Sequence, residues 1–307
     1  MTVIVRDVIE RGLIQMPVST GALISSALRE IIGLEPGSVL DAGCGFGLWG
    51  FLCRLYLDVF PGRRYRDDWQ VRIEGIEVFP KYIMPHQQFL YDDIHVGKIE
   101  NLVDELGAFD LYIFGDVLEH LEKEIGIRVL DTACRKANKG VLINIPLGEG
   151  WRREVPDENV YEAHLSAWEL EDFAPYCPKV CGEATFPGVG QYATILVNKM
   201  LSGAERVEVM YRDGVLCAER HPDFASRCFK RAIEMGYVDP SAHFELSRLL
   251  LERQQVGEAV EILRDAIARF PDHVPTYDLL AKLLRKLNRA DEAQAVLDAK
   301  PACPNVS

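Results

Sequence analysis

Two kinds of hydrophobic pattern follow one another along the chain. In the first two-thirds, short runs of Val, Ile and Leu alternate with longer stretches in which apolar residues recur every three or four positions. The short runs predict buried β-strands, and the longer stretches predict amphipathic helices. The predicted strands are residues 38–43, 72–78, 109–116, 140–147 and 192–199. The predicted helices are residues 48–60, 81–91 and 118–136, with one or two short helices within 5–32.

This alternation predicts the fold class. Buried strands separated by helices are typical of α/β proteins with a mostly parallel sheet covered on both faces. We therefore expect a Rossmann-like sheet of the seven-stranded type over residues 1–202. The last strand follows the Gly/Pro-rich segment TFPGVGQ, so we expect it to be a hairpin partner at the sheet's edge. Residues 203–221 hold an Asp-Gly pair between apolar runs and predict a linker or a small hairpin.

From Pro222 the pattern repeats itself. Residues 242–259 match residues 276–293 at an offset of 34, with Leu and Ala recurring at equivalent positions. A 34-residue period of paired amphipathic helices resembles tetratricopeptide repeats. The resemblance covers residues 222–301 and implies a small all-α helical-repeat domain. With only about two and a half periods, we expect its exposed face to be completed by the first domain, by self-association or by a protein partner.

Composition and charge narrow the range of partners. Hydrophobic residues make up 48% of the chain and charged residues 26%, as in ordinary globular proteins. The net charge of −13 repels phosphate groups, so we expect neither nucleic acid nor an anionic membrane as a partner. The eight cysteines form no CxxC pair, and the first residues, MTVIVRDVIERG, hold no continuous apolar segment. We therefore expect a cytoplasmic protein.

The stretch VLDAGCGFGLWG, residues 39–50, places a carboxylate between a buried strand and a glycine loop. A strand, a glycine loop and a helix bring backbone N–H groups close to a ligand. The spacing of Gly45, Gly47 and Gly50 fits the dinucleotide fingerprint GxGxxG. Asp41 favours a different ligand, because it would oppose a diphosphate and would suit a cation. Asp41 could instead only cap the turn that follows it.

The pattern D-A-G-C-G-F-G resembles the first motif of class I S-adenosylmethionine-dependent methyltransferases. The run FDLYIFGDVLEHL, residues 109–121, resembles the fourth-strand motif of their small-molecule branch. The resemblance implies S-adenosylmethionine as the cofactor, with an acid for its ribose, a pair of residues for its adenine and a strand end beside its methyl group. The implied cofactor-binding residues are Asp41, Gly43, Gly45, Gly47, Glu77 (ribose), Asp93 and Ile94 (adenine), and Asp116 (methyl).

Methyl transfer depends mainly on positioning, and it needs a base only where the acceptor holds its proton at neutral pH. Histidine is suited to that task. His120 follows the fourth strand, and His164 lies in a segment whose spacing predicts a helix and which borders the acceptor in related enzymes. Either histidine could instead be structural. Together with Asp116 and Glu119 they have the right types for a metal site, but the spacing does not demand one, and we expect none.

The loop that contains Trp151, Arg152 and Arg153 would supply an aromatic wall and two anion-binding groups for a sugar, carboxylate or phosphate. It could equally be an exposed polar loop. The sequence thus predicts a methyltransferase that acts on O or N of a small molecule or glycan precursor. The alternatives are a non-catalytic cofactor-binding scaffold, a protein methyltransferase that recruits partners through its repeats, and an NAD-linked oxidoreductase.

Overall fold

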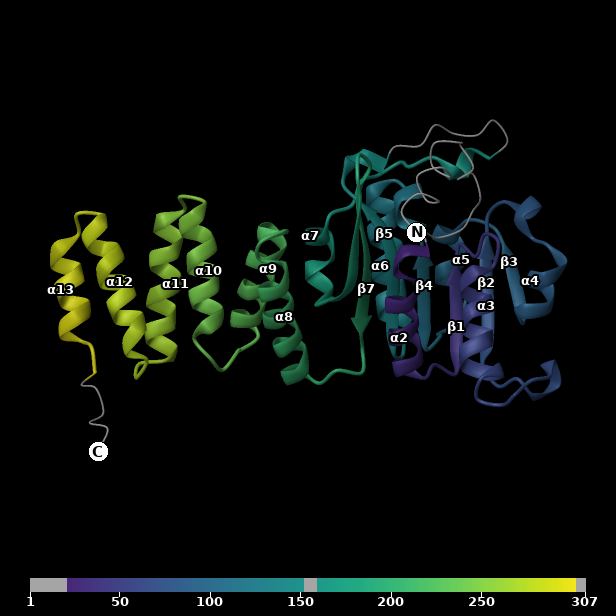
Figure 1. Cartoon of the computed structure of the whole chain (residues 1–307), viewed down its shortest axis with the longest axis horizontal. Helices are drawn as coiled ribbons and strands as arrows, with labels where there is room; N and C mark the ends of the chain where they lie inside the picture. Colours follow the sequence, from purple (N-terminus) through teal and green to yellow (C-terminus); the bar gives the residue numbers. More distant parts are fainter. Residues whose placement is uncertain (1–20, 152–158, 302–307) are drawn as a thin grey trace. The chain divides into compact units, whose positions relative to one another are not determined.

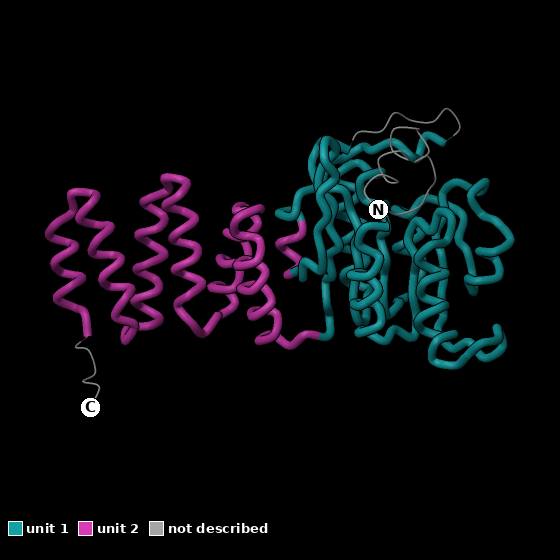
Figure 2. Tube along the Cα trace, viewed as in Figure 1, with its two compact units in different colours: residues 1–172, 178–200 teal, residues 173–177, 201–307 magenta. Residues whose placement is uncertain are grey.

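The computed structural model describes residues 21–151 and 159–301, and the chain forms two compact units (Figure 2). The first unit contains the residues up to Asp172 and Pro178–Met200. The second contains Phe173–Cys177 and the residues from Leu201 onward. Among the described helices, none combines the length and the apolar character that crossing a membrane requires.

A seven-stranded sheet organises the first unit (Figure 1). Its strand order is β3-β2-β1-β4-β5-β7-β6; the first five strands are parallel, and β7 is antiparallel to both β5 and β6. The strands are β1 (Ser38–Ala42), β2 (Arg72–Glu77), β3 (Asp93–Val96), β4 (Leu111–Gly115), β5 (Gly140–Leu147), β6 (Lys179–Phe186) and β7 (Gly190–Asn198). The predicted fold class, a mostly parallel seven-stranded α/β sheet, is confirmed.

The edge of the sheet differs from the prediction. The last strand, β7, lies between β5 and β6, so its hairpin partner β6 forms the edge instead. β6 shows neither an apolar run nor an alternation of apolar and polar residues, since the residues on both of its faces are mostly half-buried. Its sequence therefore does not predict a strand. β3 was missed for a related reason, since it is only four residues long and includes Asp and His.

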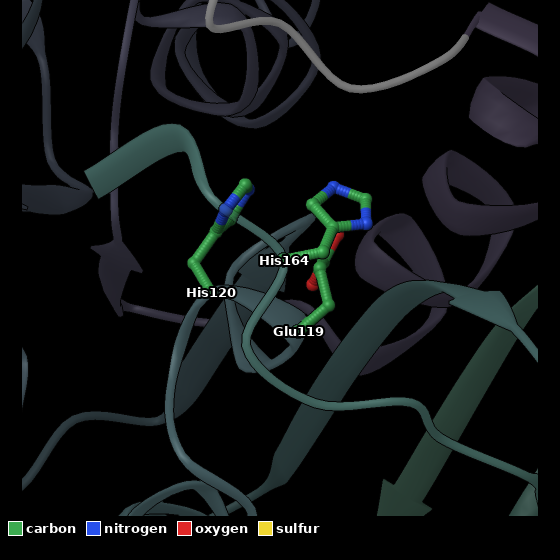
Figure 3. Close-up of side chains that lie close together, drawn as sticks. All are labelled: Glu119, His120 and His164. Carbon is green, nitrogen blue, oxygen red and sulfur yellow. The ribbon is translucent and has the colours of Figure 1, made fainter. Parts of the chain in front are cut away.

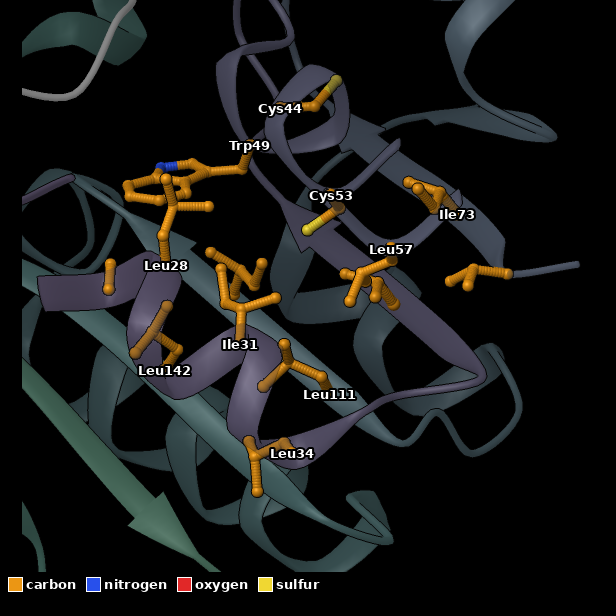
Figure 4. Packing of buried hydrophobic residues seen from close by; sticks show 14 of the residues in the cluster. Leu28, Ile31, Leu34, Cys44, Trp49, Cys53, Leu57, Ile73, Leu111 and Leu142 are labelled. Atoms are coloured by element: carbon orange, nitrogen blue, oxygen red, sulfur yellow. The ribbon is translucent and has the colours of Figure 1, made fainter. Parts of the chain in front are cut away.

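Helices cover both faces of the sheet (Figure 1). They are α2 (Ile24–Leu34), α3 (Leu48–Arg54), α4 (Pro85–Leu90), α5 (Ile99–Glu105), α6 (Lys123–Lys136) and α7 (Leu170–Phe173). On one face, Leu28, Ile31 and Leu34 of α2 pack against Leu111 and Leu142 of the sheet, beside α3 (Figure 4). The helices α5 and α6 lie on the opposite face (Figure 1).

Short helical turns also occur along this part of the chain. These turns are η1 (Gly21–Leu23), the π-helical η2 (Leu55–Val59), which continues α3, η3 (Arg66–Asp68), η4 (Pro80–Tyr82), η5 (Leu118–His120), η6 (Glu149–Trp151), η7 (Val160–Glu162) and η8 (Ala174–Tyr176). The helix predicted over 118–136 is split into η5 and α6, with extended backbone at Leu121. The helix predicted around His164 is absent, because only η7 and α7 are helical in that part of the structure.

The second unit consists of helices in antiparallel succession. They are α8 (Gly203–Cys217), α9 (Pro222–Glu234), α10 (Ser241–Glu252), α11 (Val256–Arg269), α12 (Val274–Lys286) and α13 (Ala290–Asp298). The linker or hairpin predicted for 203–221 is wrong: α8 begins with a capping box between Ser202 and Glu205. Ala225, Ala259 and Ala293, spaced 34 residues apart, are fully buried in one apolar cluster, as the repeat predicts.

Candidate functional site

The glycine loop lies at the carboxyl end of β1, where the strand order reverses between β2 and β4. In open α/β sheets such a switch point is where ligands bind. Gly43 and Gly47 have φ angles of 91° and 87°, which side-chain-bearing residues rarely adopt. A Cβ on Gly43 would come within 2.6 Å of Val117 Cγ2. The loop is therefore packed directly against the segment that follows β4.

Backbone N–H groups of the loop are already engaged within the protein. Those of Gly43 and Cys44 donate to the Ile76 carbonyl oxygen at 3.0 and 2.8 Å. That of Gly45 donates to Glu77 Oε2 at 2.9 Å. A diphosphate depends on free N–H groups at such a loop, because they provide its main hydrogen bonds. This loop instead uses three of them to hold the end of β2.

Glu77 is the last residue of β2 and is 5% exposed. Its Oε2 accepts the Gly45 N–H, and its Oε1 accepts the Phe79 N–H at 2.8 Å. Burial raises the pKa of this carboxyl. The two hydrogen bonds lower its pKa, and the nearby charge of Glu162 raises it. These hydrogen bonds fix both oxygens of Glu77 at the end of the strand. A carboxylate held in this way is suited to accept hydrogen bonds from hydroxyl groups.

Asp41, in contrast, is directed into the protein. Its Oδ2 accepts from Tyr91 Oη at 2.5 Å and from the Gly50 N–H at 3.3 Å, and the residue is 1% exposed. Burial raises the pKa of Asp41 to about 7, while its hydrogen bonds from Tyr91 and Gly50 lower it. The prediction that its charge meets a ligand cation stays a prediction. The geometry agrees with the alternative, in which Asp41 caps the start of α3.

Asp93 and Ile94 are at the wrong end of β3 for the predicted adenine contact. Asp93 opens the strand with an exposed side chain, and Ile94 packs against the core. Val96, at the other end, is the register partner of Glu77. Since a strand rises about 3.3 Å per residue, Asp93 lies about 10 Å short of the site. Gly97, which follows Val96, donates its N–H to the Glu77 carbonyl oxygen at 2.9 Å, so this end of β3 is the one beside Glu77.

Asp116 follows β4 with a φ of 55°, an uncommon conformation for a residue with a side chain. Its Oδ2 accepts from Tyr192 Oη at 2.8 Å. Trp151 packs edge-on to Phe186, with ring centroids 5.3 Å apart, and lies 6.1 Å from the ring of Tyr192. These aromatic rings form a wall that reaches the end of β4. The other two predicted acceptor residues, Arg152 and Arg153, lie outside the described residues.

Glu119, His120 and His164 come together although 44 residues separate the two histidines (Figure 3). One ligand atom from each lies within 4.8 Å of the others. The two imidazole rings meet at 83° with centroids 4.9 Å apart, and Glu119 is 2% exposed. The side chains project to the same side of the ribbon, two from η5 and one from the loop after η7 (Figure 3).

The hydrogen bonds of this cluster fix the His120 ring. His120 Nδ1 lies 3.1 Å from the Ala163 carbonyl oxygen. A carbonyl oxygen only accepts, so Nδ1 carries a proton and donates it to Ala163. The N–H groups of Leu165 and Ser166 donate to the Glu119 carbonyl oxygen at 2.8 and 3.1 Å. The segment that carries His164 is therefore tied to η5.

The same segment also approaches the glycine-loop side of the site. Tyr82 interacts with Asn159 and Glu162, and its pKa is raised chiefly by burial. Glu162 in turn lies close enough to Glu77 to raise the pKa of that carboxyl. Val117, which touches Gly43, directly precedes η5. One continuous region thus extends from Glu77, past the glycine loop, to the Glu119–His120–His164 cluster.

Comparisons with known proteins bear mainly on the second unit. A family model described as Tetratricopeptide repeat matches residues 239–303, which confirms the predicted resemblance there. A search of curated proteins gives no match.

Solved structures with partial similarity include TehB from Haemophilus influenzae, at 17% identity and a TM-score of 0.40 over 59% of this chain and 63% of that one. Magnesium protoporphyrin IX methyltransferase (ChlM) from Synechocystis PCC 6803 with bound SAM is 16% identical, with a TM-score of 0.38 over 56% of this chain and 76% of that one. MamA is 18% identical, with a TM-score of 0.28 over 31% of this chain and 56% of that one. The matched part spans less than two thirds of the TehB and MamA chains.

Proposed function

We propose that this protein transfers a methyl group from S-adenosylmethionine to O or N of a small molecule or glycan precursor. The observation that carries this proposal is the position of Glu77 at the end of β2. Each of its oxygens accepts one backbone N–H and keeps capacity for a second donor. The two ribose hydroxyls of the cofactor are suitable donors, and the adenine would lie beside Val96 and Lys98.

Two further features favour this cofactor over a dinucleotide. Loop N–H groups that a diphosphate would bind are used internally, beside the buried acids Asp41 and Glu77. The dinucleotide-binding fold has six parallel strands, whereas this sheet ends in the antiparallel pair β7 and β6. We assign Asp41 a positioning role, in which it holds Tyr91 and α3 against the glycine loop.

In the proposed reaction, a lone pair of the acceptor attacks the methyl carbon in line with the departing sulfur. The new bond to carbon forms as the C–S bond breaks, and sulfur keeps the electron pair and loses its positive charge. Asp116 borders the methyl group, and the wall that includes Trp151 receives the acceptor. We assign activation of the acceptor to Glu119, His120 and His164, because these three side chains converge there. Arg152 and Arg153 remain proposed acceptor contacts.

The test is transfer of label from S-adenosylmethionine tritiated in its methyl group to a cell extract, with Glu77→Gln as the comparison. We expect label in the small-molecule fraction with the wild-type protein and much less with the variant. Label in the protein fraction would favour a protein acceptor, for which the tetratricopeptide repeats would supply the docking unit. Tight cofactor binding without any transfer would overturn the proposal in favour of a scaffold.

A further inference from the structure

We propose that Glu119, His120 and His164 bind one divalent transition-metal ion. The proposed use of that ion in catalysis rests on the methyl-transfer function, but its binding does not. The three side chains are the only group of at least three possible ligand residues that converges within the part of the chain the structure describes. This reverses our expectation from sequence, in which spacing alone gave no reason for a metal.

The donor set has a recognisable chemistry. Two imidazoles and one carboxylate are the protein ligands of many catalytic zinc sites and of facial-triad iron sites, both of which keep a position open. Metal–ligand distances of about 2.1 Å separate tetrahedral ligands by about 3.4 Å. The ligand atoms here lie within 4.8 Å of one another. Binding a tetrahedral ion would therefore draw these atoms together by up to about 1.4 Å.

The surroundings of the cluster provide a second, independent observation. A metal-bound histidine usually donates its other N–H to a carbonyl or carboxylate oxygen, which fixes its tautomer and orientation. His120 Nδ1 lies 3.1 Å from the Ala163 carbonyl oxygen and donates its proton to it in the same way. The Glu119 carbonyl oxygen receives two N–H groups from the His164 segment, which fixes one ligand-bearing segment against the other. The support that a metal site needs is thus built around the ligands.

Asp116 is not among the converging ligand residues, and its Oδ2 accepts from Tyr192 Oη. Three protein ligands leave a coordination position for the hydroxyl or amine of the acceptor. A bound divalent ion would lower the pKa of that group and orient it. The acceptor proton would pass to water, and the resulting lone pair would attack the methyl carbon. The metal ion ends the reaction unchanged.

The experiment is a titration of the full-length protein, freed of metal with a chelator, with Co²⁺ and then with Zn²⁺. Absorption spectroscopy and calorimetry follow the binding. We expect one equivalent of Co²⁺, visible d–d bands, no thiolate charge-transfer band, and displacement by Zn²⁺. Glu119→Gln and His164→Ala should each weaken binding at least about tenfold. The matched control is His95→Ala, since His95 lies in β3 outside the cluster and its Nε2 bonds Glu74 in β2; it should bind as the wild type does.

The proposal is overturned if the wild-type protein binds no Co²⁺, if a thiolate charge-transfer band accompanies binding, or if His95→Ala loses as much affinity as His164→Ala. Should the cluster variants fail to fold, the cobalt spectrum of the wild type and a metal-dependent rise in its Tm decide the matter. A separate titration with S-adenosylmethionine keeps the two proposals apart. Cofactor binding without metal binding refutes only the metal site, and metal binding without cofactor binding refutes only the methyltransferase.

Discussion

Two buried carboxylates stand beside the glycine loop, and their hydrogen bonds give them different roles. Glu77 presents both oxygens at the end of its strand, each fixed by one N–H. Asp41 directs Oδ2 toward Tyr91 and the start of α3, where its bonds hold the protein together. The sequence identified both residues as acids near a ligand. It could not separate their roles, because these depend on Tyr91, which lies 50 residues after Asp41.

Replacing Glu77 tests its role directly. We expect Glu77→Gln to weaken S-adenosylmethionine binding about 10–100-fold, since hydrogen bonds to a charged group contribute about 1.5–3 kcal/mol. Isothermal titration measures the affinity. Glu74→Gln, three residues earlier in the same strand and bonded to His95, is the control and should change little. Equal losses in the two variants would contradict the ribose assignment.

Asp41 should make the stability of the first unit depend on pH. The folded protein keeps the Asp41 proton up to a pKa of about 7, whereas the unfolded chain releases it near 3.8. The protonated Asp41 side chain therefore contributes its full stabilisation of the folded state below about pH 4. This contribution to the free energy of unfolding, up to about 4 kcal/mol, is lost as the pH rises through 7. Asp41→Asn cannot ionise, so the variant should gain stability relative to wild type between pH 5 and pH 8. Urea unfolding followed by tryptophan fluorescence measures this.

An unchanged pH dependence in Asp41→Asn would show that another group is responsible. The same variant also tests the ligand side of the account. Because the Asn carbonyl oxygen can still accept from Tyr91, S-adenosylmethionine should bind within a few-fold of the wild-type affinity. A loss comparable to that of Glu77→Gln would return Asp41 to the role of a direct cation partner.

At the scale of elements, the sequence predicted β1, β2, β4, β5 and β7 and missed β3 and β6. β1, β4 and β5 are almost entirely buried and read as largely apolar runs. β3 is only four residues long and includes Asp and His, so its sequence does not predict a strand; the structure places Asp93 at its start, opposite Glu74. The cluster at Glu119 depends on two helix breaks that periodicity alone did not reveal.

The contact between α3 and the residue after α4 is tight enough to be tested with one methyl group. A Cβ on Gly50 would come within 2.1 Å of Tyr91 Cζ. We expect Gly50→Ala to destabilise the first unit by about 1–3 kcal/mol. Gly33→Ala in α2 is the control, because no atom lies within 4 Å of its added Cβ; it should be neutral or stabilising by about 0.5–1 kcal/mol. Urea unfolding compares them, and a neutral Gly50→Ala would contradict the packing described.

At the scale of the whole molecule, each of the two units has its own hydrophobic cluster among the described residues. One lies between α2, α3 and the sheet, and the other runs through the repeat helices. The sequence predicted this change of architecture because its periodicity changes near Pro222. It did not predict α8, since an Asp-Gly pair more often marks a turn, whereas here Gly214 lies inside a helix against Phe229.

Separate cores predict separate effects of cavity-forming mutations. Leu142 in the sheet and Leu280 in α12 are both buried, and truncation of either to Ala should cost about 2–5 kcal/mol. All four tryptophans belong to the first unit. Leu142→Ala should therefore shift unfolding seen by tryptophan fluorescence, and Leu280→Ala should shift only a transition seen by far-UV circular dichroism. Identical shifts in both signals for both variants would contradict two separate cores.

The central claim is that the region between Glu77 and the glycine loop receives a sulfonium cofactor and rejects a diphosphate. Parallel isothermal titrations of the wild-type protein with S-adenosylmethionine and with NAD test it most directly. The account predicts saturable one-to-one binding of S-adenosylmethionine and no measurable binding of NAD at the same concentrations. Saturable binding of NAD, together with no measurable binding of S-adenosylmethionine, would contradict it.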